Sequence, residues 1–339
     1  MMARPPSHRF EFRQIAATGA RFSGFSPYVA SINGTGLVAF QAALSGGGSG
    51  VFAGSGGAVE RLDAGAAATI YSHPDINDAG DVSFYAESGA GVQGVHWAGR
   101  GGGSVVTDAS GGFGRVGPLG PTMNEAGTVA FRAVSKAGRA GIFVRRGAEA
   151  PVTVAESGDR FESFHGLPVI NRHGTVVFRA DLKDGSKGIF AGNGGDPAAV
   201  AGTGGPFGDL ALFPDANDSG TVAFCATLKS GGDGVFTVAE GRLTTRVADR
   251  RRFEGFRSAL INNPGRLLFF ATPVGGALGL FAGPDPDADR IIGLGDPLEG
   301  SIVKDVAANP VSLNDAGLVA LRVRLADGRE LIIRADPTG

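Results

Sequence analysis

Short apolar segments alternate with glycine-containing turns along the whole chain, and the same pattern recurs at nearly equal intervals. Each copy centres on an Asn-x-x-Gly turn followed by an apolar strand that usually ends in Phe, as in Asn33 to Gly36 and the strand LVAF. A period of about 40 to 50 residues is typical of propeller blades. Seven copies are present, with successive anchors 44, 47, 47, 46, 45 and 52 residues apart: Asn33, Asn77, Asn124, Asn171, Asn217, Asn262 and Asn314.

Each copy also contains the apolar segments needed for one complete blade. A short, often proline-bearing strand precedes the anchor, and a segment ending in Gly-apolar-Phe follows it, for example Gly188 to Phe190. A fourth segment of Val-Ala type comes next, as in Pro151 to Ala155. Four short strands joined by tight turns make one blade. The pattern therefore predicts an all-β, seven-bladed β-propeller with four antiparallel strands in each blade.

The two ends of the sequence predict how the ring closes. The last copy stops after its third strand, Leu331 to Ala335, while the N-terminal segment Phe12 to Gly19 has no earlier strands of its own. Its sequence FRQIAATG resembles the fourth strands VTVAESG and TTRVADR. We therefore expect the N-terminal strand to complete blade seven, which removes the exposed sheet edges of an open array. Because no linker interrupts the repeat, residues 1–339 are predicted to form one domain.

The repeated asparagines have a structural explanation that needs no ligand. An Asn side chain can accept a hydrogen bond from a backbone N–H two residues on, and the Gly supplies the positive φ of a tight turn. Asp75 and Asp215, each two residues before an anchor, are expected to hydrogen-bond to backbone lower in the channel. The turns are too short to wrap a calcium ion. The sequence therefore predicts no metal site in these turns.

Charge and composition exclude several classes of partner. The chain of 339 residues has 31 basic and 33 acidic residues, so no summed positive field attracts nucleic acid or an anionic membrane. It has no run of about 18 apolar residues and no apolar N-terminal signal, which predicts a cytoplasmic protein. We expect a monomer. The single cysteine, Cys225, lies in an apolar strand and is predicted to be a buried, inert thiol.

No motif in the sequence indicates a cofactor. The glycine-rich segment Ser45 to Gly50 is not followed by Gly-Lys-Ser/Thr or by a helical pattern, so it is not a phosphate-binding loop. Motifs for nucleotide, flavin or haem binding are likewise absent from the sequence. We therefore expect no cofactor.

The repeat resembles the signature Asn-x-x-Gly-x-x-x-Ala-Phe of a family of bacterial tandem-repeat proteins. The resemblance covers the chain from Phe12 to Ala335, and the full signature begins at Asn33, Asn124 and Asn217. Other copies are degenerate, because other residues replace the Ala or the final Phe. The resemblance implies a propeller-like repeat fold and a bacterial origin. It implies no mechanism, since fold does not determine function.

Candidate functional positions are those that break the repeat near one end of the channel. We define the upper mouth as the end opposite the Asn-x-x-Gly turns. Five and six residues before each anchor the seven blades carry dissimilar residues, whereas purely structural positions repeat. The groups there that can transfer protons or bind anions, with His73 one step deeper, are Tyr28, Tyr71, His73, His165, Arg257 and Asn309.

Each candidate also has a structural explanation. Histidines and tyrosines at such positions are often hydrogen-bonded or packing residues, and Arg257 could pair with Glu254 or Asp305 instead of a ligand. Two histidines near the mouth are too few for a site of three or four His ligands. We assign candidate proton transfer to four residues and candidate ligand binding to three: His165, His73, Tyr71 and Tyr28 for the first, and Arg257, Asn309 and Lys304 for the second.

One insertion lies close to these residues. From Gly295 to Asn314 the chain uses 19 residues where the equivalent stretch from Gly158 to Asn171 uses 13. We place the extra residues at Ser301 to Val306, which include Lys304. The segment is either a lid or binding loop at the mouth or a neutral surface insertion.

Three functions remain open from the sequence. The first is small-molecule binding at the upper mouth, extending to non-redox acid–base chemistry of hydrolase, lyase, isomerase or cyclase type. The second is a protein-interaction scaffold without catalytic activity. The third is a lectin with one sugar site in each blade, which is disfavoured because one Trp and three Tyr cannot supply a repeated stacking residue. The expected partner is therefore a small molecule or another protein.

Overall fold

Seven antiparallel sheets are arranged as the blades of a β-propeller, which confirms the predicted fold class. The computed structural model of the chain describes residues 10–63, 68–99, 102–109 and 112–338. Within this part of the chain all regular elements are strands except one turn of 3-10 helix, η1 (Pro310–Ser312). No helix among these residues is long and apolar enough to cross a membrane.

Each blade consists of four strands in sequence order, and the innermost strand is often split into two pieces. Blades one to four have the following bounds: β2 (Phe22–Gly24), β3 (Ser31–Ile32), β4 (Val38–Leu44), β5 (Ser49–Gly54) and β6 (Glu60–Arg61); β7 (Ala68–Tyr71), β8 (Asp75–Ile76), β9 (Val82–Ser88), β10 (Gln93–Gly99) and β11 (Gly102–Asp108); β12 (Phe113–Val116), β13 (Thr122–Met123), β14 (Thr128–Ser135), β15 (Ala140–Arg146) and β16 (Val152–Glu156); β17 (Phe161–Ile170), β18 (Val176–Leu182), β19 (Lys187–Gly192) and β20 (Ala198–Gly202).

The last three blades follow the same scheme, and the final blade takes its outer strand from the N-terminus. Their bounds are β21 (Phe207–Leu210), β22 (Asp215–Ala216), β23 (Val222–Leu228), β24 (Asp233–Ala239) and β25 (Arg242–Val247); β26 (Phe253–Ile261), β27 (Leu267–Pro273), β28 (Gly279–Phe281) and β29 (Arg290–Gly293); β30 (Pro297–Leu298), β31 (Ser301–Ala307), β32 (Val319–Leu325), β33 (Glu330–Pro337) and β1 (Phe10–Ala17).

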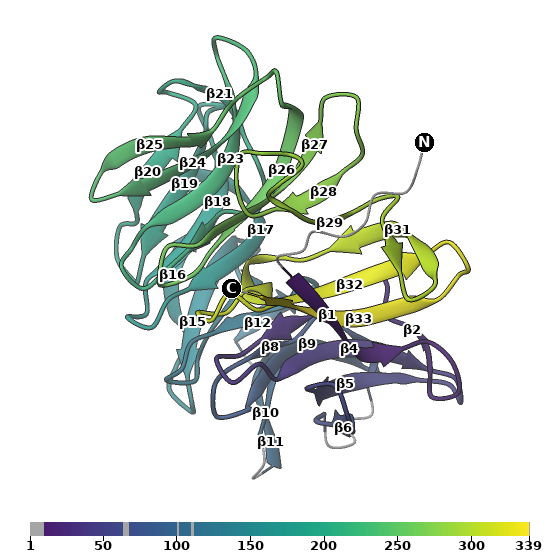
Figure 1. Cartoon of the computed structure of the whole chain (residues 1–339). Helices are drawn as coiled ribbons and strands as arrows, with labels where there is room; N and C mark the ends of the chain where they lie inside the picture. Colours follow the sequence, from purple (N-terminus) through teal and green to yellow (C-terminus); the bar gives the residue numbers. More distant parts are fainter. Residues whose placement is uncertain (1–9, 64–67, 100–101, 110–111, 339) are drawn as a thin grey trace.

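Closure occurs as the sequence predicts. Strand β1 pairs antiparallel with β33 from Phe10 opposite Pro337 to Ala17 opposite Leu331. Figure 1 shows this N-terminal strand, in purple, against the yellow C-terminal blade. The side chains of Phe10 and Ile15 are buried, so β1 contributes to the core as well as to the sheet. The edge of β33 is therefore covered by strand pairing.

A recurring trio of phenylalanines packs the interior of most blades. In blade five, Phe207 meets Phe236 edge to face at 4.9 Å between ring centroids, and Phe236 stacks on Phe224 at 5.9 Å. Edge-to-face and offset geometries are the favourable arrangements of aromatic rings. The Phe that recurs within the second and third strands therefore forms a layered core. Cys225, beside Phe224, is 1% exposed, and burial raises the pKa of its thiol, as expected of an inert cysteine.

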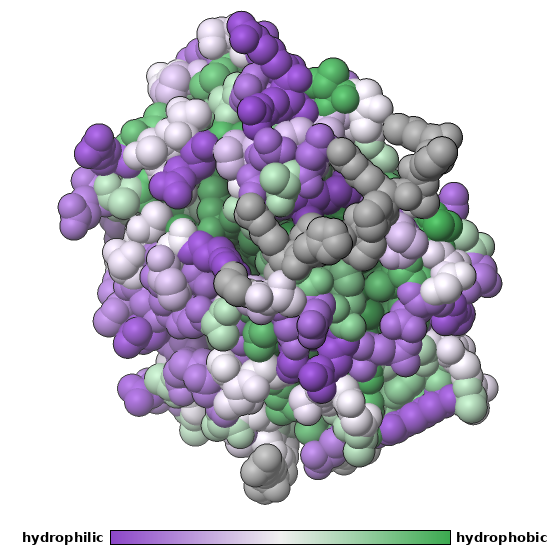
Figure 2. Space-filling view, viewed as in Figure 1, coloured by the Kyte–Doolittle hydropathy of each residue, from purple (hydrophilic) through white to green (hydrophobic). Residues whose placement is uncertain are grey.

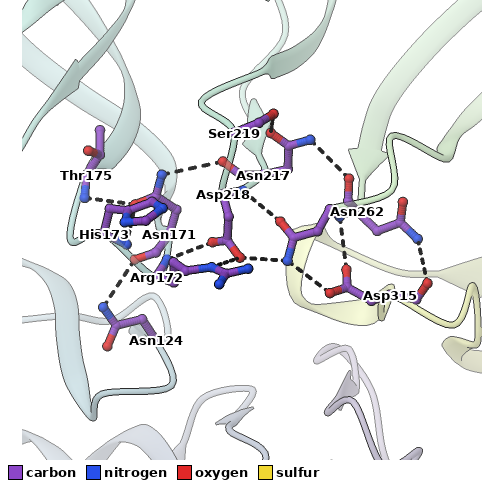
Figure 3. Close-up of polar contacts among 11 residues, drawn as sticks. Asn124, Asn171, Arg172, His173, Thr175, Asn217, Asp218, Ser219, Asn262 and Asp315 are labelled. Carbon is purple, nitrogen blue, oxygen red and sulfur yellow. Dashed lines mark hydrogen bonds and ion pairs between the residues drawn. The ribbon is translucent and has the colours of Figure 1, made fainter.

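The anchor asparagines join the blades around the lower mouth. Asn217 accepts hydrogen bonds at Oδ1 from the Thr221 N–H (3.0 Å) and the Ser219 hydroxyl (2.7 Å). Its Nδ2 donates to the carbonyl of Asn262 in the next blade at 3.1 Å. Figure 3 shows part of this circle. Six anchors donate in this way to the following blade: Asn33, Asn124, Asn171, Asn217, Asn262 and Asn314.

A second row of bonds explains the acidic residues that follow several anchors. The N–H of Arg172 donates to Asp218 Oδ1 at 2.8 Å, the N–H of Asp218 to Asn263 Oδ1 at 2.7 Å, and the N–H of Asn263 to Asp315 Oδ1 at 2.9 Å (Figure 3). These carboxylates therefore bind backbone of the neighbouring blade. Among the described residues, no group of three or more His, Cys, Asp or Glu side chains could hold a metal ion.

Asp75 and Asp215 bind backbone in the channel as predicted. The two Asp75 oxygens accept from the N–H groups of Ile76 (2.9 Å) and Met123 (2.7 Å). The Asp215 oxygens accept from Ala216 (2.8 Å) and Ile261 (2.7 Å). Burial raises their pKa values, to about 7 and about 8, although these hydrogen bonds lower them. Both carboxyls are thus structural links between non-adjacent segments.

The predicted insertion at Ser301 to Val306 is corrected by the structure. These residues form strand β31, which pairs with β32 as the inner strand of blade seven. They are therefore neither a lid nor a loop. The additional length lies just before them, in the hairpin in which β30 pairs with β31, Pro297 opposite Ile302. The comparison of Gly295–Asn314 with Gly158–Asn171 gave the length of the insertion but not its place, because it did not show where the inner strand begins.

Candidate functional site

A cavity of about 680 Å³ occupies the upper mouth, where the segments between the two halves of the inner strands come together. Its wall is mainly apolar, and a few charged and polar side chains interrupt it. Cavities of this size with few polar groups are typical of small-molecule sites. The residues that line it are Pro27, Tyr28, Val29, His73, Pro118, Leu119, Gly120, Ala211, Leu212, Phe213, Arg257, Ser258, Phe270, Asp305, Val306, Ala307, Ala308, Asn309 and Arg322.

On the face seen in Figure 2, polar side chains cover most of the outer surface, and apolar side chains are visible between them nearer the middle of the view. The exposed large apolar residues among the described chain include Leu212, which is 47% exposed at the cavity. A contiguous apolar lining at a channel mouth favours a ligand with an apolar part.

Arg257 is the cationic group of the cavity that remains without a partner. It is exposed at the end of the Phe253–Phe256 segment of β26, and it makes no hydrogen bond or ion pair with another described residue. The alternative in which Arg257 pairs with Asp305 is not realised, because Asp305 Oδ2 lies 2.8 Å from Nη2 of Arg322. Arg257 is therefore available to an anionic ligand.

Arg322 and Asp305 form an ion pair within the wall of the cavity. Arg322 is 6% exposed, and its Nη1 donates to the Ser26 hydroxyl at 3.1 Å. Its Nε is buried and has no hydrogen-bond partner among the described residues. Glu330 holds the adjoining loop by accepting from the N–H groups of Phe25 (2.6 Å) and Ser26 (2.9 Å). This network positions the loop that carries Tyr28.

His73 lines the cavity as a neutral, enclosed imidazole. It is 8% exposed, and burial lowers its pKa to about 4. Gly120 packs so closely on it that a Cβ there would lie 2.6 Å from His73 Nε2. That nitrogen is buried without a hydrogen-bond partner among the described residues. His73 is therefore uncharged near neutral pH.

Tyr28 and Asn309 also border the cavity, in different ways. Tyr28 is half-buried, and burial raises the pKa of its hydroxyl, so it remains a protonated donor. The Asn309 side chain accepts from the Val311 N–H at 3.2 Å and caps η1. Asn309 thus has a structural task in addition to its place on the wall.

Three of the sequence-predicted residues lie away from this cavity. Tyr71 is 1% exposed in the core between blades one and two, where burial and a hydrogen bond to Asp63 raise its pKa. Lys304 is exposed on β31 and does not line the cavity. His165 is also outside the lining and is bound by Asp181. The structure therefore brings together Tyr28, His73, Arg257 and Asn309, and separates the other three.

Ser163, His165 and Asp181 form a trio whose geometry is not that of a catalytic triad. His165 Nε2 is 2.9 Å from Ser163 Oγ and 2.8 Å from Asp181 Oδ2, so both contacts use the same ring nitrogen. A triad needs the serine and the acid on opposite nitrogens. Burial raises the pKa of Asp181, but His165 and Arg179 outweigh this and lower it. The trio is a hydrogen-bonded cluster rather than a nucleophile and its base.

Sequence reasoning missed Arg322, and it named Asp305 only as a partner for Arg257. Arg322 directly follows Leu321, which stands at the final Phe of the repeat signature. The residue at this position is Arg in three of the seven blades and varies in the others: Gln41, Tyr85, Arg132, Arg179, Cys225, Phe270 and Arg322. A search for charged residues in the second strand would therefore have found Arg322.

Comparisons with known proteins support the fold. Neither a protein-family model nor a curated protein sequence matches the chain. The oligogalacturonate lyase of Vibrio parahaemolyticus aligns over 98% of both chains with a TM-score of 0.60 and 10% identity. An oligogalacturonate lyase in complex with manganese gives 0.60 and 11% over 98% of both chains. A puromycin-hydrolyzing peptidase of Mycobacterium tuberculosis gives 0.56 and 15%, over 99% of this chain and 55% of that one. At such identities the likeness concerns the fold alone, which is compatible with an enzyme or a binding protein.

Proposed function

We propose that the chain binds a small organic monoanion with an apolar body in the upper-mouth cavity, and that Arg257 binds its anionic group. The observation that carries the proposal is an unpaired guanidinium at the rim of a mainly apolar cavity of about 680 Å³. Charge-assisted hydrogen bonds from Arg to a carboxylate are among the strongest polar contacts available to a ligand.

The charges around the cavity favour a ligand with one negative charge. Arg322 and Asp305 compensate each other at 2.8 Å, and His73 is neutral because burial lowers its pKa to about 4. Arg257 then leaves a net charge of one positive unit on the lining. A monoanion would balance this charge, whereas a dianion would carry an unpaired charge into a mainly apolar space.

The walls supply the rest of the expected affinity. Leu119, Leu212 and Phe213 face the cavity from blades three and five. Burying apolar ligand surface against such side chains contributes roughly 25 cal/mol for each Å² removed from water. We therefore expect aliphatic or aromatic carboxylates to bind better than short, fully polar ones.

The arrangement supports binding more than acid–base catalysis. A general base must lie within hydrogen-bond reach of the proton that it removes. His73 Nε2 is buried, and His165 is bound to Asp181 outside the cavity. Tyr28 is a donor with a raised pKa and lacks an adjacent base among the described lining residues. Proton transfer therefore has less support than recognition of an anion.

Calorimetry with matched ligand pairs tests the proposal. Octanoate, phenylacetate and indole-3-acetate are each compared with the corresponding neutral amide. We expect the carboxylates to bind and the amides to bind at least tenfold more weakly. Arg257→Ala should weaken carboxylate binding by about 2 kcal/mol, which is roughly 30-fold, and Arg257→Lys should retain part of it.

His165→Ala provides the matched control, because His165 lies outside the cavity lining. It should leave carboxylate binding unchanged. The proposal is wrong if all three carboxylates fail to bind, if the amides bind equally well, or if Arg257→Ala retains the wild-type affinity.

A further inference from the structure

A second hollow, of about 540 Å³, lies on the lower side between blades two and three. It is distinct from the upper-mouth cavity, and the two share no lining residue. We call it the Trp97 groove. Its chemistry comes from one aromatic, one hydroxyl, two carboxylates and two guanidinium groups: Trp97, Ser104, Asp81, Glu125, Arg145 and Arg146.

Three of these side chains break the repeat. Trp97 is the only Trp of the chain. None of the residues at the equivalent position of the third strand in the other blades is aromatic: Ala53, Val144, Ala191, Thr237, Ala282 and Arg334.

Arg145 and Asp81 are equally unusual for their positions. Arg145 replaces residues that are small or apolar in the other six blades, and Asp81 is the only acid four residues after an anchor. Trp97 and Asp81 come from blade two and Arg145 from blade three, yet all three meet in one groove. The core does not require these residue types, since the other blades form without them.

The contacts around the groove leave the Asp81 carboxylate available and hold Arg145 in place. The Asp81 carboxylate makes no hydrogen bond or ion pair to another described residue. A Cβ on Gly99 would overlap Asp81 Oδ1 and would lie 3.1 Å from Trp97 Cη2, so the acid and the indole lie close to the same backbone. Arg145 donates from Nη1 to the Val106 carbonyl, and its buried Nε has no hydrogen-bond partner among the described residues.

The groove is balanced in charge, unlike the upper-mouth cavity. Asp81 and Glu125 supply two negative charges, and Arg145 and Arg146 supply two positive charges. Donors and acceptors therefore face the same space without a net charge. An uncharged ligand that both donates and accepts hydrogen bonds, and that has an apolar face for the indole, fits this set of groups.

We propose that the Trp97 groove binds a pyranose sugar unit. The C–H faces of a pyranose are apolar and can pack against Trp97, while its hydroxyls can donate to Asp81 and accept from Arg145. Hydrogen bonds to charged groups are stronger than those between neutral groups. This proposal is independent of the function proposed for the upper mouth.

The chain itself offers a matched comparison. The corresponding hollow between blades five and six has about 340 Å³ and carries Thr237 in place of Trp97 and Thr221 in place of Asp81. It lacks both the aromatic and the acid. Only one of these two equivalent grooves is therefore expected to bind a sugar.

Trp97 fluorescence tests the proposal directly, because no other Trp contributes to the emission. The probes are the methyl α- and β-pyranosides of glucose, galactose, mannose, fucose and N-acetylglucosamine, each up to about 50 mM. We expect at least one to change the emission in a saturable way. Calorimetry then gives the affinity of variants that lack the indole.

Asp81→Ala should weaken binding at least tenfold without lowering the melting temperature, since Asp81 has no described side-chain partner. Trp97→Ala should abolish binding and Trp97→Phe should retain part of it. Thr221→Ala and Arg257→Ala should leave sugar binding unchanged, which separates this site from the equivalent groove and from the upper mouth. The inference is overturned if none of the pyranosides binds, or if binding survives Asp81→Ala.

Discussion

Replacing Asn217 with Ala measures how much one anchor contributes to the ring. Asn217 is 5% exposed and makes three side-chain hydrogen bonds, two accepted within its own turn and one donated to the Asn262 carbonyl. The substitution leaves the Thr221 N–H and the Asn262 carbonyl without these partners. Each unsatisfied buried group costs about 1 to 3 kcal/mol, so we expect a loss of about 3 kcal/mol in the free energy of unfolding.

Scanning calorimetry converts this loss into a temperature. With an unfolding entropy of about 2.1 cal/mol/K per residue, 339 residues give about 0.7 kcal/mol/K. A loss of about 3 kcal/mol should therefore lower the melting temperature by about 4 °C. Urea unfolding provides an independent value of the free energy.

Asn77 is the control within the chain. Its Oδ1 accepts from the Asp81 N–H at 2.8 Å, but among the described residues its Nδ2 has no hydrogen bond to the next blade. Asn77→Ala should therefore cost about 1 kcal/mol less than Asn217→Ala. Equal losses for the two variants, or a loss below about 1 kcal/mol for Asn217→Ala, would refute the assignment of an inter-blade role to the anchor amide.

Two further predictions concern closure and the mouth loop. Deleting residues 1–17 removes β1 and uncovers the edge of β33, so the truncated chain should melt at a lower temperature and aggregate. A peptide of residues 10–19 added in trans should restore the melting temperature, and a scrambled peptide should not. An unchanged melting temperature after the deletion would contradict closure by pairing. For Glu330, partial burial alone raises the pKa, but hydrogen bonds from Ser26 and Phe25 and the charge of Arg322 lower it below the usual 4.5. The stability that ionised Glu330 contributes to the folded protein is therefore present above about pH 4.5 and is lost as the pH falls through the folded-state pKa. The free energy of unfolding, measured with urea, should fall more steeply below pH 4.5 for the wild type than for Glu330→Gln. The same pH dependence in both proteins would disprove this role.

The fold could be predicted from the repeat because every copy contains the residues for the same turn and the same core packing. The anchor Asn, the positive φ of the turn glycine and the interior phenylalanines act within one blade or between neighbours. Gly220, for example, has φ of 79° and its N–H donates to the Asn217 carbonyl at 3.0 Å. Seven copies of the same local pattern support the same fold. Closure could be predicted because the last copy lacks a fourth strand and the N-terminal segment supplies one.

Counting back from the anchor failed for Tyr71 because inner strands differ in length. Tyr71 pairs with Ala86, Phe164 with Ala180 and Leu210 with Ala226. The three alanines occupy the same position of the second strand, so Tyr71, Phe164 and Leu210 are equivalent. All three are therefore core positions. Tyr71 lies six residues before its anchor, whereas Phe164 and Leu210 lie seven residues before theirs. A count of six residues therefore reaches the mouth in blades four and five but a core position in blade two.

His165 and Arg257 show why even a correct register does not identify a site. Each directly follows a phenylalanine of its inner strand, Phe164 or Phe256, but His165 pairs with Arg179 whereas Arg257 stands at a bulge between Phe256 and Ser258. The neighbouring strand adds a second difference. In blade four the residue opposite Ser163 is Asp181, which binds His165 at 2.8 Å, while in blade six the equivalent residue opposite Gly255 is Thr272, which carries no charge. His165 is thereby hydrogen-bonded to Asp181, whereas Arg257 has no hydrogen bond or ion pair to another described residue. For the proposed anion site, the uncharged residue on the adjacent strand is therefore as important as the arginine itself.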